Sequence, residues 1–170
     1  MPMNARIAES HTFGRPDTDA SYDDVRDDDL IRDTSLPTTA LIGRILIASI
    51  FLVSGISKLT DTPGTVAHMA GMGIPYPETL AIVAGTAEVL GAIAILTGFL
   101  TRVASGGLIL FMIPTTLIFH AFWDYEGQER LPQMVNFMKN LAIIGGLAAL
   151  TGLGAGRFSI DHRLRRRHVR

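Results

Sequence analysis

The sequence predicts an all-α integral membrane protein: a four-transmembrane-helix up-down bundle with its N and C termini in the cytoplasm. Of the 170 residues, 48% are hydrophobic and the mean hydropathy is +0.31, which is high for a soluble domain of this size. The apolar residues fall into four blocks, at about residues 38–57, 80–100, 103–123 and 134–153. Helices of that length cross a hydrocarbon core of about 30 Å.

The positively charged residues set the predicted orientation. With four spans, both tails and the 98–102 turn share one side, which holds eleven Lys and Arg residues. The other side holds only two, Lys58 and Arg130. Because Lys- and Arg-rich segments stay in the cytoplasm, the chain is predicted to be a multi-pass membrane protein with both tails inside.

The two tails differ in composition. Residues 1–35 hold nine acidic residues and four arginines with few large apolar side chains, which predicts disorder. This tail is either a solvating segment or an acidic docking arm. Residues 157–170 hold six arginines, which suit anionic lipid headgroups. With a net charge of −1, the chain is not expected to bind nucleic acid, and zero cysteines exclude disulfides and thiolate metal sites.

The first span carries one regularly spaced stripe that contains both of its basic residues. The stripe recurs at spacings of four, three, four and three residues and comprises Arg44, Ala48, Phe51, Gly55 and Lys58. Such spacing places these side chains on one helical face. Both basic residues of the span lie on it, so the stripe is expected to face the bundle rather than lipid. After it, Asp61-Thr62-Pro63 predicts the start of a short helix through Met69.

The second span is interrupted by one charge, Glu88, near its middle. A carboxylate at that depth costs about 2.5 kcal/mol or more on insertion scales, so it needs a partner, a proton or water. The span is also rich in small residues, which let helices approach closely in lipid: Ala81, Ala84, Gly85, Ala87, Gly91, Ala92 and Ala94. It is therefore predicted to form the inner wall of the bundle, with Glu88 facing inward.

The last two spans carry further polar residues. Pro114 is expected to kink the third span, and His120 lies near its end, before the interfacial Trp123. Lys139 and Asn140 lie in the first third of the fourth span.

Depth along each helix, at about 1.5 Å per residue, suggests a pocket. The polar residues placed in the outer half of the bundle are Glu88, His120, Lys139 and Asn140, with Lys58 above them at the outer edge. On depth alone, Lys139 is the predicted partner of Glu88 and His120 the second choice, while Arg44 lies too far toward the inner side. A purely structural role stays open for each residue: Arg44 and Lys58 can extend to lipid headgroups.

Cofactor motifs are not expected in this chain. His120 is the only histidine within a predicted span, so no metal site is predicted. The sequence also has no glycine-rich nucleotide, flavin or nicotinamide motif, so no covalently bound cofactor is expected.

A series of short motifs follows one another from residue 38 to residue 162. They are Arg44, F-L-V-S-G-I-S-K-L at 51–59, G-I-P-Y-P at 73–77, Glu88 followed by Leu96-Thr97-Gly98, Thr101-Arg102-Val103-Ala104, Asn140, and Ser159-Ile160-Asp161. Their order and spacing resemble the DoxX family of small four-helix bacterial inner-membrane proteins. The resemblance implies Arg44, Lys58, Glu88 and Asn140 as site positions. It also implies an association with quinone-linked membrane oxidoreductases, while distant relatives act in cargo export or receptor assembly.

These observations lead to one main hypothesis. The chain is predicted to be an accessory subunit, not catalytic alone, that joins a membrane or redox protein partner. Its outer pocket would hold a quinone or a lipid headgroup. The alternative is a membrane assembly factor or chaperone without a small-molecule site. A small transporter is a third reading, although four spans without an inverted repeat would need a homo-oligomer to build a path.

Overall fold

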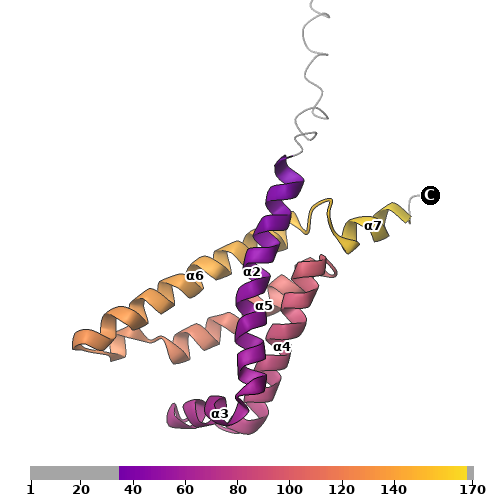
Figure 1. Ribbon diagram of the computed structural model, residues 1–170. Helices are drawn as coiled ribbons and strands as arrows, with labels where there is room; N and C mark the ends of the chain where they lie inside the picture. The colour runs from indigo at the N-terminus through magenta and orange to yellow at the C-terminus, as the bar shows by residue number, and fades with distance from the viewer. Residues whose placement is uncertain (1–34, 168–170) are drawn as a thin grey trace, which may run out of the picture. The chain divides into compact units, whose positions relative to one another are not determined.

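The computed structural model describes residues 35–167, and the predicted disordered tail lies outside that range apart from Ser35. Within the described residues the chain forms helices and no strands (Figure 1). In order, they are α2 (Ser35–Thr60), α3 (Thr62–Gly71), α4 (Pro77–Thr97), α5 (Thr101–Phe119), the 3-10 turns η1 (Phe122–Asp124) and η2 (Gly127–Glu129), α6 (Arg130–Leu153) and α7 (Ile160–Arg167).

Four segments are long and apolar enough to cross a membrane. They are Pro37–Thr60, Pro77–Thr97, Thr101–Asp124 and Gly127–Leu153. These correspond to the four predicted spans, so the predicted all-helical, four-span fold is confirmed. The second span ends three residues earlier than predicted, because Gly98 takes a left-handed φ of 70° and caps α4. The cytoplasmic placement of the termini stays a prediction.

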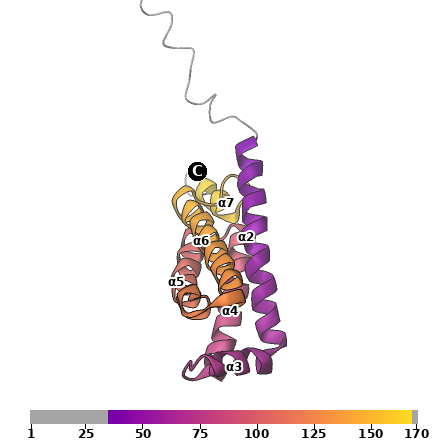
Figure 2. The ribbon, with the colours of Figure 1, turned by 90° about the vertical axis from the view of Figure 1, so that its left-hand side faces the viewer.

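The helices associate in pairs. α2 runs along α4 and α5 runs along α6, while α4 and α5 join the two pairs. Figures 1 and 2 show α5 and α6 set at an angle to the α2–α4 pair, with α3 across the end where α2 finishes and α4 begins. Asp61 fixes the start of α3, because its Oδ1 accepts a hydrogen bond from the Gly64 amide at 3.0 Å. The predicted short helix is thus confirmed, and it extends to Gly71.

Small residues set the distance between α2 and α4. A Cβ atom added to Gly55 would lie 2.8 Å from the carbonyl oxygen of Gly85, and one on Gly85 would lie 3.2 Å from the carbonyl oxygen of Gly55. The two backbones therefore touch at this point, as small residues allow in lipid. The predicted inner wall is also observed, because Ala81, Ala84 and Glu88 are among the buried residues of α4.

The packed interior is small and draws on all four spans. Its main cluster comprises Ala48, Phe51, Ala92, Ile95, Leu108, Met112, Ile143, Leu147 and Leu150. Large apolar side chains remain on the outside, and Val103 and Leu110 are 70% and 73% exposed. An apolar exterior of this kind is suited to lipid.

Candidate functional site

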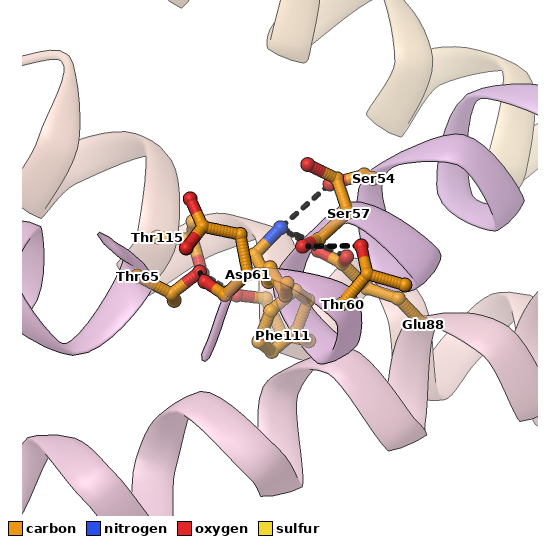
Figure 3. A network of polar contacts seen from close by, with 9 residues as sticks. Ser54, Ser57, Thr60, Asp61, Thr65, Glu88, Phe111 and Thr115 are labelled. Atoms are coloured by element: carbon orange, nitrogen blue, oxygen red, sulfur yellow. Dashed lines mark hydrogen bonds and ion pairs between the residues drawn. The ribbon is translucent and has the colours of Figure 1, made fainter. Parts of the chain in front are cut away.

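Glu88 pairs with Lys58. The Lys58 Nζ atom lies 2.9 Å from Glu88 Oε2 and 3.1 Å from Oε1, and it also donates a hydrogen bond to Ser54 Oγ at 2.6 Å. Figure 3 shows Ser54 and Glu88 joined through one nitrogen, with Thr65, Phe111 and Thr115 beside them. Glu88 is only 4% exposed. Its predicted inward orientation is confirmed, but the predicted partners, Lys139 and then His120, are wrong.

The direction of the side chains explains this pairing. Helical side chains lean toward the N-terminus of their own helix. α2 runs toward α3 and α4 runs away from it, so Lys58 leans back along α2 while Glu88 leans toward the α3 end. The two charges approach each other from antiparallel helices. Reasoning from Cα depth alone placed Lys58 at the outer edge and missed this.

A cavity of about 240 Å³ lies beside the ion pair, and we call it the α3 cavity. Four helices and the residue after α5 line it, with Lys58 from α2, Thr65, His68 and Met69 from α3, Ala84 from α4, Phe111, Thr115 and Phe119 from α5, and His120. The His68 and Phe119 rings stack, with centroids 5.3 Å apart. The α3 cavity therefore combines hydrogen-bonding groups with flat apolar surfaces.

His120 shares the α3 cavity with Lys58. Its Nδ1 lies 2.9 Å from Gln133 Oε1. With the amide oxygen as acceptor, a neutral imidazole carries its proton on Nδ1 and keeps a lone pair on Nε2. The ring can then accept a hydrogen bond or a proton from a ligand.

The polar residues of α6 lie elsewhere. Lys139 is exposed, and its ammonium donates to Asn136 Oδ1 at 2.9 Å. Asn140 donates to Thr116 Oγ1 at 3.1 Å, between α6 and α5. Neither residue is among those that line the α3 cavity, because α6 packs mainly against α5. Lys139 and Asn140 were predicted at a depth similar to that of Glu88, but that similarity did not place them at the ion pair.

Arg44 belongs to the opposite end of the bundle. It is 1% exposed and donates four hydrogen bonds to backbone carbonyls: to Ile95 at 2.9 Å, Leu96 at 2.6 Å, Ala155 at 2.9 Å and Phe158 at 2.6 Å. Ile95 and Leu96 lie in the last turn of α4, where carbonyls lose their i+4 amide partners, and Ile95 accepts a 3.2 Å bond from the Gly98 amide at i+3 instead. Arg44 thus fastens α2 to the end of α4 and to the segment before α7. It neither reaches the α3 cavity nor extends to headgroups.

The α3 residues of the cavity were not singled out from the sequence. Thr65, His68 and Met69 are spaced at i, i+3 and i+4, which places them on one face of the predicted short helix. This spacing is the sequence feature from which the three cavity residues of α3 could have been identified. Within residues 35–167, no group of three or more His, Asp or Glu residues is placed to hold a metal ion.

Comparison with known proteins places these features in a wider context. The chain matches the DoxX family over residues 39–121, a range that includes every residue lining the α3 cavity. It is similar to inner membrane protein YphA of Escherichia coli K12, with 39% identity over 127 residues, covering 75% of this chain and 91% of that protein. For inner membrane protein YqjF of the same strain the identity is 38% over 128 residues, covering 75% and 92%. The membrane protein Rv3486 of Mycobacterium tuberculosis is 27% identical over 146 residues, covering 77% and 84%. No solved structure matches the chain.

Proposed function

The chain belongs to the DoxX family of inner-membrane proteins, and on that premise we propose that it binds a quinone head group and serves as an accessory subunit of a membrane oxidoreductase. One observation carries the proposal: the α3 cavity brings Lys58, fixed by Glu88, together with His68 and His120 beside two aromatic rings.

The α3 cavity suits a quinone in size and chemistry. An apolar protein cavity of about 150 Å³ holds a benzene molecule, so 240 Å³ leaves room for a substituted ring. A quinone ring is flat and apolar and carries two carbonyl oxygens as hydrogen-bond acceptors. Phe111 and Phe119 offer apolar ring surfaces, and Lys58 and the His68 imidazole offer donors, while His120 Nε2 offers an acceptor for the hydroxyl of the reduced quinol.

The ion pair favours a neutral ligand over an anion. An ammonium has three N–H donors, and Ser54 Oγ and the two Glu88 oxygens accept from them at 2.6, 2.9 and 3.1 Å. A ligand oxygen can take the place of Glu88 Oε1, the most distant of these acceptors, while Oε2 keeps the ion pair. Because Glu88 already balances the charge of Lys58, the site does not require an anionic headgroup. In this proposal Glu88 positions the lysine, and Lys58 contacts the quinone.

The proposal assigns electron transfer to a partner subunit. The chain has no cysteine, which rules out thiol redox chemistry and Cys-ligated iron–sulfur clusters within it. Protein purified from membranes in mild detergent should therefore bring a redox subunit with it. Mass spectrometry that finds no oxidoreductase among the co-purified proteins would contradict the accessory role.

Photo-crosslinking tests the quinone site directly. An azido-quinone should label wild-type protein in native membranes, Lys58→Met should abolish labelling, and Glu88→Gln should reduce it. Lys139→Met is the matched control, because it removes an exposed lysine whose ammonium bonds Asn136 on its own helix. Equal labelling of all four proteins would overturn the proposal.

A second candidate is a membrane assembly factor without a small-molecule site. It is favoured by the fact that Arg44 and Glu88, both under 5% exposed, have their hydrogen bonds met within the chain. Under this alternative the polar interior only fixes the bundle. Glu88→Gln would then lower thermal stability, partner proteins would be lost in step with folding, and no quinone would label the protein.

A further inference from the structure

A second cavity of about 240 Å³ adjoins the α3 cavity, and we call it the α4–α5 groove. The two share five lining residues: Met69, Ala84, Phe111, Thr115 and Phe119. A molecule seated in the α3 cavity can therefore continue into the α4–α5 groove while keeping contact with the same side chains.

The α4–α5 groove is apolar and faces outward. The residues that it does not share with the α3 cavity are Ile74, Leu80, Val83, Ala87, Pro114 and Ile118, none of which carries a charge. Leu80, Val83 and Ile118 are 40%, 55% and 45% exposed. In a membrane-spanning bundle, side chains exposed on α4 and α5 face the hydrocarbon core, so the groove opens sideways into the bilayer.

From this arrangement we infer that the ligand is an amphiphile that carries a hydrocarbon tail, with its head group in the α3 cavity and the first part of its tail in the α4–α5 groove. The inference rests on the proposed function and narrows its ligand class to membrane-resident, tailed quinones. The polar groups line the α3 cavity, and apolar groups line the α4–α5 groove, which meets lipid. This arrangement matches the polar head and the apolar tail of such a molecule.

The order of the two compartments also gives an entry path. A tailed quinone is dissolved in the bilayer, so it arrives through the hydrocarbon rather than from water. The head group passes the groove and reaches Lys58, and the tail remains where the head group entered. A small polar quinone would use only the α3 cavity and would gain nothing from the α4–α5 groove.

The test compares two probes on purified full-length protein. One is tetramethyl-benzoquinone, which has no tail, and the other is ubiquinone with one isoprene unit. Wild-type protein should bind the tailed probe about 10-fold more tightly, a factor that corresponds to 1.4 kcal/mol of added packing. Ala87→Phe, which fills the groove without touching the α3 cavity, should remove that difference and leave tailless binding unchanged.

Leu90→Phe is the matched control, because Leu90 is 61% exposed on the same helix and lies outside both sets of lining residues. If Ala87→Phe does not fold, Val83→Phe fills the same wall. Equal binding of the two probes, or no effect of either groove variant, would overturn the tail site while the quinone head site stood. Failure of both probes to bind wild-type protein would instead overturn the proposed function itself.

Discussion

The Lys58 ammonium lies 2.9 Å from Glu88 Oε2 and links the end of α2 to the middle of α4. The lysine side chain is 24% exposed and the glutamate side chain 5%. The carboxylate is thus almost fully removed from solvent, whereas Lys58 is more exposed and lines the α3 cavity. A buried charge that loses its partner is left uncompensated in a low dielectric, which costs far more than removing both charges together.

Lys58→Met should therefore destabilise the protein by roughly 3 kcal/mol. The double variant Lys58→Met/Glu88→Leu should recover most of that loss, because it leaves no charge behind. Unfolding of each variant in mild detergent, followed by the loss of helical circular dichroism, provides the measurement.

Lys139→Met is the control for this prediction, and its stability should equal that of wild type. Lys139 is exposed and its ammonium bonds Asn136 on its own helix. If Lys58→Met and Lys139→Met unfold alike, the ion pair contributes nothing to the fold.

The fold could be predicted from the sequence because each span is a local feature. Apolar length marks the four spans, and Asp61 before Thr62-Pro63 marks α3. Proline at position 114 did not prevent α5 from continuing to Phe119. The α7 helix within the basic tail was not predicted, since its eight residues carry no apolar block.

The site could be predicted only in part. Glu88 was identified from the cost of its charge, but its partner depended on the direction in which side chains lean. Depth says nothing about position around the bundle, which is why Lys139 and Asn140 were wrongly grouped with Glu88. The stacking of His68 on Phe119 joins α3 to α5, and no local pattern in the sequence records such a tertiary contact.

Gly55→Ala should destabilise the α2–α4 contact. The added Cβ would meet the Gly85 carbonyl oxygen at 2.8 Å, and backbone cannot move aside as a flexible side chain can. Overpacking of this kind costs about 1–3 kcal/mol. Because Lys58 lies one turn away, the same substitution should also weaken azido-quinone labelling.

Gly107→Ala is the matched control for Gly55→Ala. A Cβ there has no heavy atom within 4 Å, so its only effect is the higher helix propensity of alanine. Its thermal midpoint should equal or exceed that of wild type. A Gly55→Ala variant as stable as Gly107→Ala would show that the two helices are not packed backbone to backbone.

Arg44→Lys should be destabilising despite the retained charge. A guanidinium reaches carbonyls on two separate segments, the end of α4 and residues 155–158, whereas an ammonium is a single point donor. A buried carbonyl left without its donor costs about 2 kcal/mol. The expected result is a lower thermal midpoint together with faster proteolysis in residues 154–159.

Arg163→Lys serves as the control for Arg44→Lys, since the Arg163 side chain is exposed on α7. It should leave both the midpoint and the cleavage rate unchanged. Equal cleavage of the two variants would mean that Arg44 does not hold the segment before α7 in place.

Asp161 lies in α7 but caps the start of α5, which is far from it in the sequence. Removing its carboxylate should loosen the first turn of α5. Leu100 stands at the N-cap of α5 and has no side-chain oxygen, so Asp161 supplies two. They accept hydrogen bonds from the Leu100 and Thr101 amides at 2.8 and 3.0 Å. Asp161→Ala should cost about 1 kcal/mol, the usual loss for a helix cap. The stability of Asp161→Asn should lie between that of wild type and that of Asp161→Ala. The asparagine keeps one acceptor oxygen but loses the negative charge that a helix N-terminus favours. Amide exchange at residues 100–103 measures the effect.

Arg166→Ala, on the exposed side of α7, should leave that exchange at the wild-type rate. Exchange in Asp161→Ala as slow as in Arg166→Ala would mean that the α5 start is held without this carboxylate.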